Sequence, residues 1–102
     1  MAKICGGWSE PQEATEETQK ICDQVKDQVE KITDQKHQVY KAVLYREQVV
    51  AGQNFLIKVF AGEDDYLHLF VFRALPCDGG RIELNGVEQH RTKGDPLEPF
   101  MN

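Results

Sequence analysis

The alternation of apolar and polar residues predicts one helix near the start of the chain, followed by several strands. Between residues 18 and 32, apolar side chains recur every three or four positions, which places them along one stripe of a helix. Thr15 is the expected N-cap, because Glu16 and Glu17 would then lie in the first turn, where the helix dipole favours negative charge. We expect the helix to end between residues 34 and 36, where the pattern changes to period two. The stripe consists of Thr18, Ile21, Cys22, Val25, Val29 and Ile32.

After the helix, side chains alternate in polarity with period two, which is typical of half-buried strands. The expected strands cover residues 39–47, 55–60 and 66–75, and a fourth begins at Ile82. Glycine-containing segments at 61–65 and 75–80 separate the later strands and predict reverse turns. Asn85 and Gly86 lie inside the fourth run, where they predict a bulge or an early end of the strand.

The third expected strand is apolar on both faces. Its two sets of side chains are Leu67, Leu69 and Val71 on one face, and His68, Phe70 and Phe72 on the other. We expect the first set to face the helix, which leaves an outer face apolar enough to be a contact surface or to favour self-association. In the irregular C-terminal tail, Leu97 and Phe100 are the candidates to hold the chain against the domain.

One helix followed by an antiparallel meander defines an α+β fold, in which the helix packs across one face of the sheet. The residues that join the first two strands predict an unusually apolar hairpin tip. They are Gln48, Val49, Val50, Ala51 and Gly52. The same pattern also allows a single strand that runs straight through, with a bulge at Gly52. If the tip is a hairpin, it lies at the same end of the sheet as the loop at 75–80, and the turn at 61–65 lies at the other end.

Composition limits the size and the partners of the domain. A chain of 102 residues with 40% apolar residues forms one domain, residues 1–102, with a single core. A formal charge of −5 argues against nucleic acid as a partner. The first residues contain no apolar signal segment and no run is long enough to span a membrane, so we expect a cytoplasmic protein without a membrane partner.

The cysteines and histidines form no pattern typical of catalysis or metal binding. Cys5, Cys22 and Cys77 are odd in number and widely spaced, which suits reduced thiols better than disulfides. Neither Cys-x-x-Cys nor His-x-x-x-His spacing is present, so we expect no metal, no cofactor, no catalytic residue and no enzyme activity. The acidic residues at 63–65 are expected to be solvated in their turn.

The pentapeptide at residues 48–52 reads QVVAG and resembles the motif of the cystatins. Three other features follow the order found in the stefins, the type 1 cystatins: the pair Gly6 and Gly7, a single early helix, and Leu75 followed by Pro76. The resemblance extends over residues 5–100. The lack of a signal segment, the lack of paired cysteines in the C-terminal half and the Leu-Pro loop favour the stefin branch over the secreted cystatins.

The resemblance implies a reversible, competitive, tight-binding inhibitor of papain-like cysteine proteases such as cathepsins L, S, H and B. In this family, a wedge made of the N-terminal trunk and two hairpin loops enters the active-site cleft. Carried onto this chain, the wedge consists of Ile4, Cys5, Gly6, Gly7, residues 48–52, Leu75 and Pro76. We expect Cys5 and Ile4 to fill the S2 and S3 pockets. Gly6, rather than Gly7, is expected to turn the backbone away from the catalytic cysteine of the protease.

Several alternatives stay open at this point, although the active form is expected to be a monomer. Residues 1–14 predict a flexible trunk, and Cys5 within it can form an intermolecular disulfide under oxidation. Val49 and Val50 are β-branched residues in a tight turn, and straightening this hinge would give a domain-swapped dimer that does not inhibit. A stefin-like scaffold that has lost inhibition could also bind a different protein through the same edge.

Overall fold

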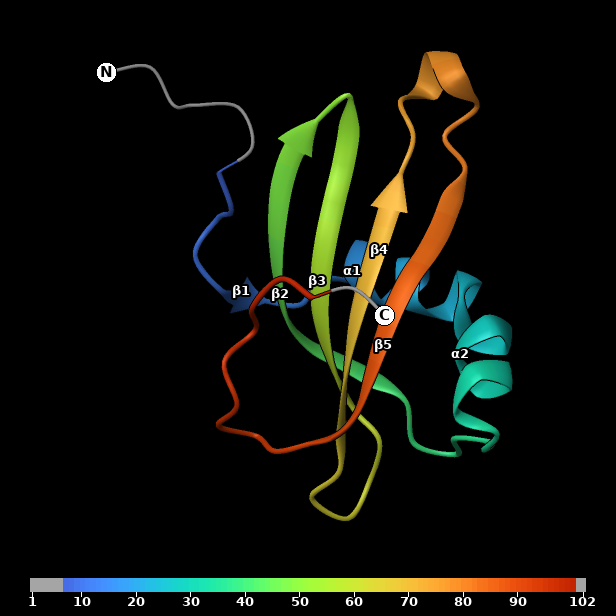
Figure 1. Cartoon of the computed structure of the whole chain (residues 1–102), viewed down its shortest axis with the longest axis vertical. Helices are drawn as coiled ribbons and strands as arrows, with labels where there is room; N and C mark the ends of the chain where they lie inside the picture. Colours follow the sequence, from blue (N-terminus) through green and yellow to red (C-terminus); the bar gives the residue numbers. More distant parts are fainter. Residues whose placement is uncertain (1–6, 101–102) are drawn as a thin grey trace.

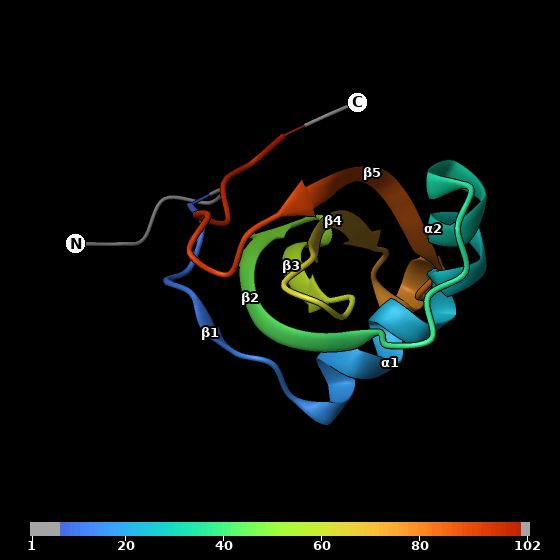
Figure 2. The same cartoon turned by 90° about the horizontal axis from the view of Figure 1, so that it is seen from below.

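The computed structural model describes residues 7–100, which form a five-stranded antiparallel sheet with two helices. The strands follow one another in chain order: β1 (Gln12–Glu13), β2 (Lys41–Val50), β3 (Gly52–Phe60), β4 (Tyr66–Arg73) and β5 (Ile82–Arg91). Helices α1 (Glu16–Gln24) and α2 (Lys26–Thr33) lie on one side of the sheet, and the C-terminal segment lies on the other (Figures 1 and 2). The expected α+β arrangement is confirmed.

The start and the end of the helical region agree with the sequence pattern. Thr15 has an extended backbone, its side chain accepts a hydrogen bond from the Thr18 amide, and the Thr18 hydroxyl accepts one from the Thr15 amide. This reciprocal pair is a capping box built with threonine in place of the usual glutamate. At the other end, Asp34 takes a left-handed conformation with φ 57° and its amide donates to the Glu30 carbonyl.

The single helix expected from the sequence is divided in two at Val25. There the backbone takes φ −102° and ψ 4°, and the Val25 amide donates to the Cys22 carbonyl at 3.2 Å. Helix α1 packs against β2 whereas α2 packs against β5, so the break lets the apolar stripe follow a twisted sheet from one side to the other. Val25 itself is buried at 1% exposure, so its side chain stays in the core while the backbone bends.

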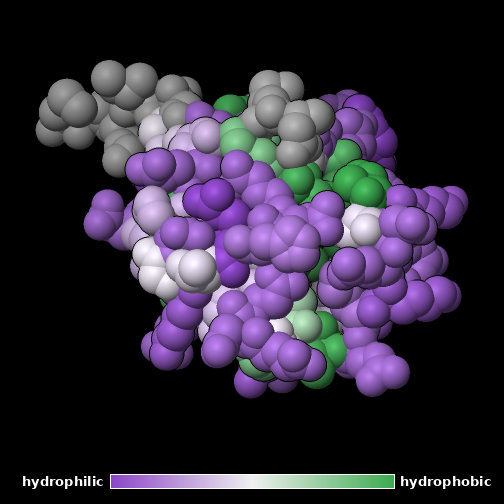
Figure 3. Space-filling model, turned by 60° about the horizontal axis from the view of Figure 1, so that its bottom comes forward, coloured by the Kyte–Doolittle hydropathy of each residue, from purple (hydrophilic) through white to green (hydrophobic). Residues whose placement is uncertain are grey.

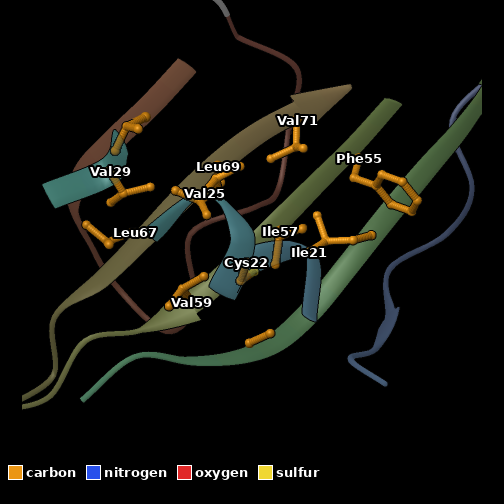
Figure 4. Packing of buried hydrophobic residues seen from close by; sticks show 12 residues of the cluster. Ile21, Cys22, Val25, Val29, Phe55, Ile57, Val59, Leu67, Leu69 and Val71 are labelled. Atoms are coloured by element: carbon orange, nitrogen blue, oxygen red, sulfur yellow. The ribbon is translucent and has the colours of Figure 1, made fainter. Parts of the chain in front are cut away.

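The core lies between the helices and the inward face of β2 to β5 (Figure 4). Its helical members agree with the predicted stripe except for Ile32, which is 56% exposed. After Val29, the next buried helical position is Thr33, four residues later, so Ile32 lies on the exposed side of α2. The buried cluster consists of Ile21, Cys22, Val25, Val29, Ala42, Phe55, Ile57, Val59, Leu67, Leu69, Val71 and Val87.

The strand pairing decides between the interpretations that the sequence left open. Strands β2 and β3 pair up to Val50 and Gly52, so Ala51 forms the tip of a hairpin and no strand runs straight through. In β5, Leu84 pairs with Val71 and Gly86 with Phe70, which leaves Asn85 as a bulge. The strand then continues to Arg91, so the asparagine and glycine bend it without ending it.

The apolar outer face of the sheet is covered by the chain itself. Leu97 of the C-terminal segment is 4% exposed, and Leu56 on the outward side of β3 is fully buried. The Lys58 ammonium group, on the same face, donates to the Lys93 and Asp95 carbonyls at 2.6 Å each. The expectation that Leu97 holds the tail is confirmed. Of the outward side chains of β4, His68 is fully buried and Phe70 contacts Phe100 of the tail, so the tail covers part of the face that the sequence indicated as a contact surface.

His68 lies under this covering with its side chain fully buried, and we expect it to make stability depend on pH. The pKa of His68 is lowered to about 4, chiefly by burial and then by the Lys58 and Arg91 charges, while Asp95 opposes them. The Glu88 carboxylate, 3.6 Å from Nδ1, is the other acid that faces the ring. Since the unfolded chain binds this proton near pH 6.5, the folded state loses stability as pH falls below that value.

The expected loss between pH 7 and pH 5 is about 1–2 kcal/mol from this group. Urea unfolding of the parent chain and of His68→Gln at the two pH values measures it. The variant is expected to be less stable at pH 7 but to lose less on acidification. An equal loss in both chains would show that His68 is not the responsible group.

Candidate functional site: a loop edge at one end of the sheet

Two loops project from the same end of the sheet, as the chain reversals require (Figure 1). They are the β2–β3 hairpin tip, residues 48–52, and the β4–β5 loop, residues 74–81. An open hollow of about 630 Å³ separates them. Its lining consists of Val49, Val50, Gly52, Gln53, Arg73, Ala74, Leu75, Pro76, Gly79 and Gly80. We call these two loops together with residues 7–9 the loop edge.

The first loop presents apolar side chains to solvent on a braced hairpin. Val49 is 62% exposed and Val50 38%, and both rank among the most exposed large apolar residues of the described chain. Below them, the Asn54 side-chain nitrogen Nδ2 donates to the Gln48 side-chain oxygen Oε1 at 2.8 Å across the two strands. Such exposure of β-branched residues adds nothing to folding, which makes these positions candidates for contact with a partner.

Gly52 holds this hairpin close to the neighbouring strand. Its φ is 124°, and a Cβ at this position would lie 2.6 Å from the Arg73 carbonyl oxygen and 2.8 Å from the Phe72 ring. The sequence indicated a glycine free to take positive φ, but not the close approach to β4. The first loop therefore packs directly against β4, the strand that leads into the second loop.

The second loop is short and closed by its own backbone. Pro76 opens a 3-10 turn, Pro76–Asp78, and the Gly80 amide donates to the Leu75 carbonyl at 2.9 Å. At the base of the loop, the Ala74 amide donates to the Arg81 carbonyl at 2.9 Å. Leu75 is 39% exposed, so its side chain lies at the surface of a rigid turn.

The N-terminal arm reaches the loop edge beside the first loop. Trp8 forms a β-bridge with Gln48, and the Ser9 amide donates to the Glu47 carbonyl at 2.8 Å. Gly7 is exposed just before this bridge. Further along, residues 12 and 13 pair with β2 as the short strand β1, although the sequence predicted an irregular arm as far as residue 14. Ile4, Cys5 and Gly6 lie outside the described residues.

Arg73 connects the two loops and the helix, a role that the sequence did not indicate. Its guanidinium lies 5.2 Å from the Phe55 ring centre and donates to the Gln53 side-chain oxygen, just after the first loop. It also forms an ion pair with Glu17 of α1 at 2.8 Å. Because an arginine fork donates in fixed directions, these contacts fix the relative position of both loops.

The chemistry of the loop edge suits binding rather than catalysis. Cys22 is buried in the core, and burial raises the pKa of its thiol far above the ordinary value. Cys77 is exposed on the second loop as a free thiol. Between residues 7 and 100, no group of histidine, cysteine and acidic side chains could hold a metal ion. In the same part of the chain, no helix has the length and apolarity needed to span a membrane.

The opposite end of the sheet has a different surface. Seen with the bottom of the molecule brought forward, the surface is predominantly hydrophilic (Figure 3). The turn there contains Glu63 and Asp64, which are both exposed. Val39 is the exposed valine beside that turn, whereas Val49, Val50 and Leu75 gather at the loop edge with the exposed Pro76.

Comparison with known proteins agrees with this architecture. Residues 6–94 match the model of the cystatin domain. The chain is 42% identical to Cystatin-B of Oplegnathus fasciatus over 100 residues, which cover 98% of this chain and all of the relative. It is 45% identical to Stefin-C of Bos taurus over 95 residues, with 93% and 94% coverage, and 43% identical to human Cystatin-B over 97 residues, with 95% and 99% coverage.

The chain belongs to the cystatin family. The names and the nearly complete coverage of these relatives place it in the stefin branch of that family. Cystatins are inhibitors of proteases, so this chain is not an enzyme.

Proposed function

We propose that this protein is a reversible, competitive, tight-binding inhibitor of papain-like cysteine proteases, including cathepsins L, S, H and B. The loop edge would enter the active-site cleft as a wedge. The observation that carries the proposal is the alignment of three segments at one end of the sheet: the arm at Trp8, the tip at Ala51 and the turn at Pro76.

The two loops have the physical properties that favour tight association. Val49, Val50 and Leu75 expose apolar surface that a cleft wall can cover, with a gain of about 25 cal/mol for each Å² removed from water. Valine has few rotamers to lose, and Pro76 holds its own backbone rigid. Little ordering entropy therefore opposes binding, which is the main benefit of a preorganised interface.

The trunk would add contacts on the non-primed side of the cleft. Residues Ile4 and Cys5 are proposed to fill the S3 and S2 pockets, and Gly6 to turn the backbone away before a peptide bond reaches the catalytic cysteine. Gly7 is the neighbouring alternative for this turn. Inhibition in this mechanism is steric, since the inhibitor supplies no nucleophile and forms no covalent bond.

The active form is proposed to be the monomer. Straightening the hairpin at Val49 and Val50 would make one long strand from β2 and β3 and would remove the first loop from the wedge. A domain-swapped dimer should then fail to inhibit. Separation by size under reducing conditions, which also excludes a Cys5-linked dimer, isolates the species to be assayed.

The test is a titration of papain and of cathepsins L and B with the reduced monomer, with residual activity and its dependence on substrate concentration as readouts. We expect competitive inhibition that Gly6→Glu weakens. Gln38→Glu is the matched control, because it adds the same charge to an exposed residue beside the turn at 61–65, at the other end of the sheet. No inhibition by the folded monomer would contradict the proposal and would favour a stefin scaffold with a different partner.

A further inference from the structure

We propose that the C-terminal segment, residues 92–100, is a positioning element for the N-terminal arm and acts on it through Arg46. By holding the arm beside the first loop, it would raise the affinity of the loop edge for its protease. This inference rests on the proposed function, and it adds a part of the chain that lies outside the wedge.

Arg46 joins the two terminal segments directly. The side chain extends from β2, where Arg46 pairs with the buried Leu56 of β3. Its Nε donates to the Ser9 carbonyl at 2.8 Å, and its Nη1 donates to the Leu97 carbonyl at 2.6 Å. One guanidinium thus satisfies one backbone acceptor from each end of the chain, and its planar fork fixes the angle between them.

An aromatic contact joins the same two segments a second time. Phe70 of β4 meets Trp8 of the arm edge to face, with ring centres 6.0 Å apart. It meets Phe100 of the tail in the same manner at 6.2 Å. Phe70 is the outward residue that the sequence indicated as part of a contact surface, and its aromatic partners are Trp8 of the arm and Phe100 of the C-terminal segment.

The C-terminal segment is itself well anchored, so it can act as a support. Leu97 is 4% exposed, and the buried Lys58 ammonium binds two carbonyls of the preceding turn, those of Lys93 and Asp95. The arm is held by its pairing with β2 at residues 8–13 and by the Glu47 amide, which donates to the Ser9 hydroxyl at 3.0 Å, but its Trp8 side chain is only half-buried. Loss of Arg46 should therefore loosen the arm before it loosens the tail.

The expected effect follows from the entropy of ordering the arm. Without Arg46, the Ser9 carbonyl loses its partner and the arm keeps only its contacts to β2 and Phe70. If binding must then fix the backbone of about one more residue, the cost corresponds to about a tenfold loss of affinity. The loss should act only through the trunk, because the Arg46 side chain donates to neither loop in the described structure.

A double-mutant cycle tests this coupling. Arg46→Met is expected to weaken inhibition of papain about tenfold in the parent chain, but by no more than about twofold in a Gly6→Glu background, where the trunk no longer contributes. Arg46→Lys, which retains one donor group, should lie between parent and Arg46→Met. Lys41→Met removes the same charge from an exposed position at the other end of the same strand, and it is expected to have no effect.

A second readout does not depend on inhibition. Trp8 is the single tryptophan of the chain, so acrylamide quenching of its fluorescence reports how firmly the arm is held. Quenching should increase in Arg46→Met and in Phe100→Ala, and stay unchanged in Lys41→Met. Unchanged quenching in the first two variants, or equal losses of inhibition in both backgrounds of the cycle, would overturn the inference. If Gly6→Glu alone leaves inhibition intact while quenching responds, the proposed trunk mechanism fails and the contact between the termini stands.

Discussion

Val49→Asp is expected to weaken inhibition of papain at least about 100-fold while leaving the fold intact. The side chain is 62% exposed in the free protein, so the charge is solvated there and folding is little affected. In the complex, the substitution removes the apolar contact of Val49, and burial of a valine side chain contributes about 1.5–3 kcal/mol. The carboxylate would also have to leave water without a partner, which adds to the loss.

Val39→Asp is the matched control for this substitution. Val39 is a valine of similar exposure, 44%, but it lies beside the turn at Gly62, at the other end of the sheet. The two variants should have similar unfolding curves and very different inhibition constants. Equal inhibition by both would show that the first loop is not part of the binding surface.

Gly52→Ala is expected to lower the free energy of unfolding by about 2–3 kcal/mol, the range typical of a substitution that combines backbone strain with a steric clash. The position has φ 124°, which disfavours any residue with a Cβ. The new methyl group would also lie 2.6 Å from the Arg73 carbonyl oxygen, and a backbone atom cannot move aside as a flexible side chain would. Relief of the clash must separate the first loop from β4, so inhibition should weaken as well.

Substitutions at two other glycines separate the contribution of backbone strain to the loss of stability from that of the steric clash. Gly79 has φ 94° but nothing within 4 Å of a Cβ, so Gly79→Ala measures backbone strain alone. Gly94 has neither a positive φ nor a close neighbour, so Gly94→Ala should be nearly neutral. Thermal or urea unfolding should rank the losses as Gly52, then Gly79, then Gly94. A Gly52 variant no worse than the Gly79 variant would contradict the importance of the close approach.

Local chemistry in the sequence predicted most of the architecture. A threonine followed by two glutamates predicted the helix start and period-two alternation predicted the strands, while Asn85 with Gly86 predicted either a bulge or an early end, of which the structure has the bulge. Reversal of the chain at each turn then required the two loops to lie at one end. These features depend on residues a few positions apart, so they can be predicted from the local sequence.

The features that the sequence did not predict depend on contacts between distant residues. Val25 continues the apolar stripe, yet the helix is divided there, where its contacts pass from β2 to β5. Lys58 alternates with apolar residues as a solvated lysine would, yet the C-terminal segment buries it at 3% exposure. In the sequence, Arg46 and Arg73 cannot be told from surface arginines, because the carbonyls and side chains that they bind come from distant parts of the chain.

The central claim is that the loop edge is the surface that enters the protease, and amide hydrogen exchange tests it most directly. Exchange of the reduced monomer should be compared with and without a slight excess of papain. The account predicts new protection at residues 7–9, 48–52 and 74–81, and unchanged exchange in the turn at 61–65. Protection centred on that turn or on α2, with the three loop-edge segments unchanged, would contradict it.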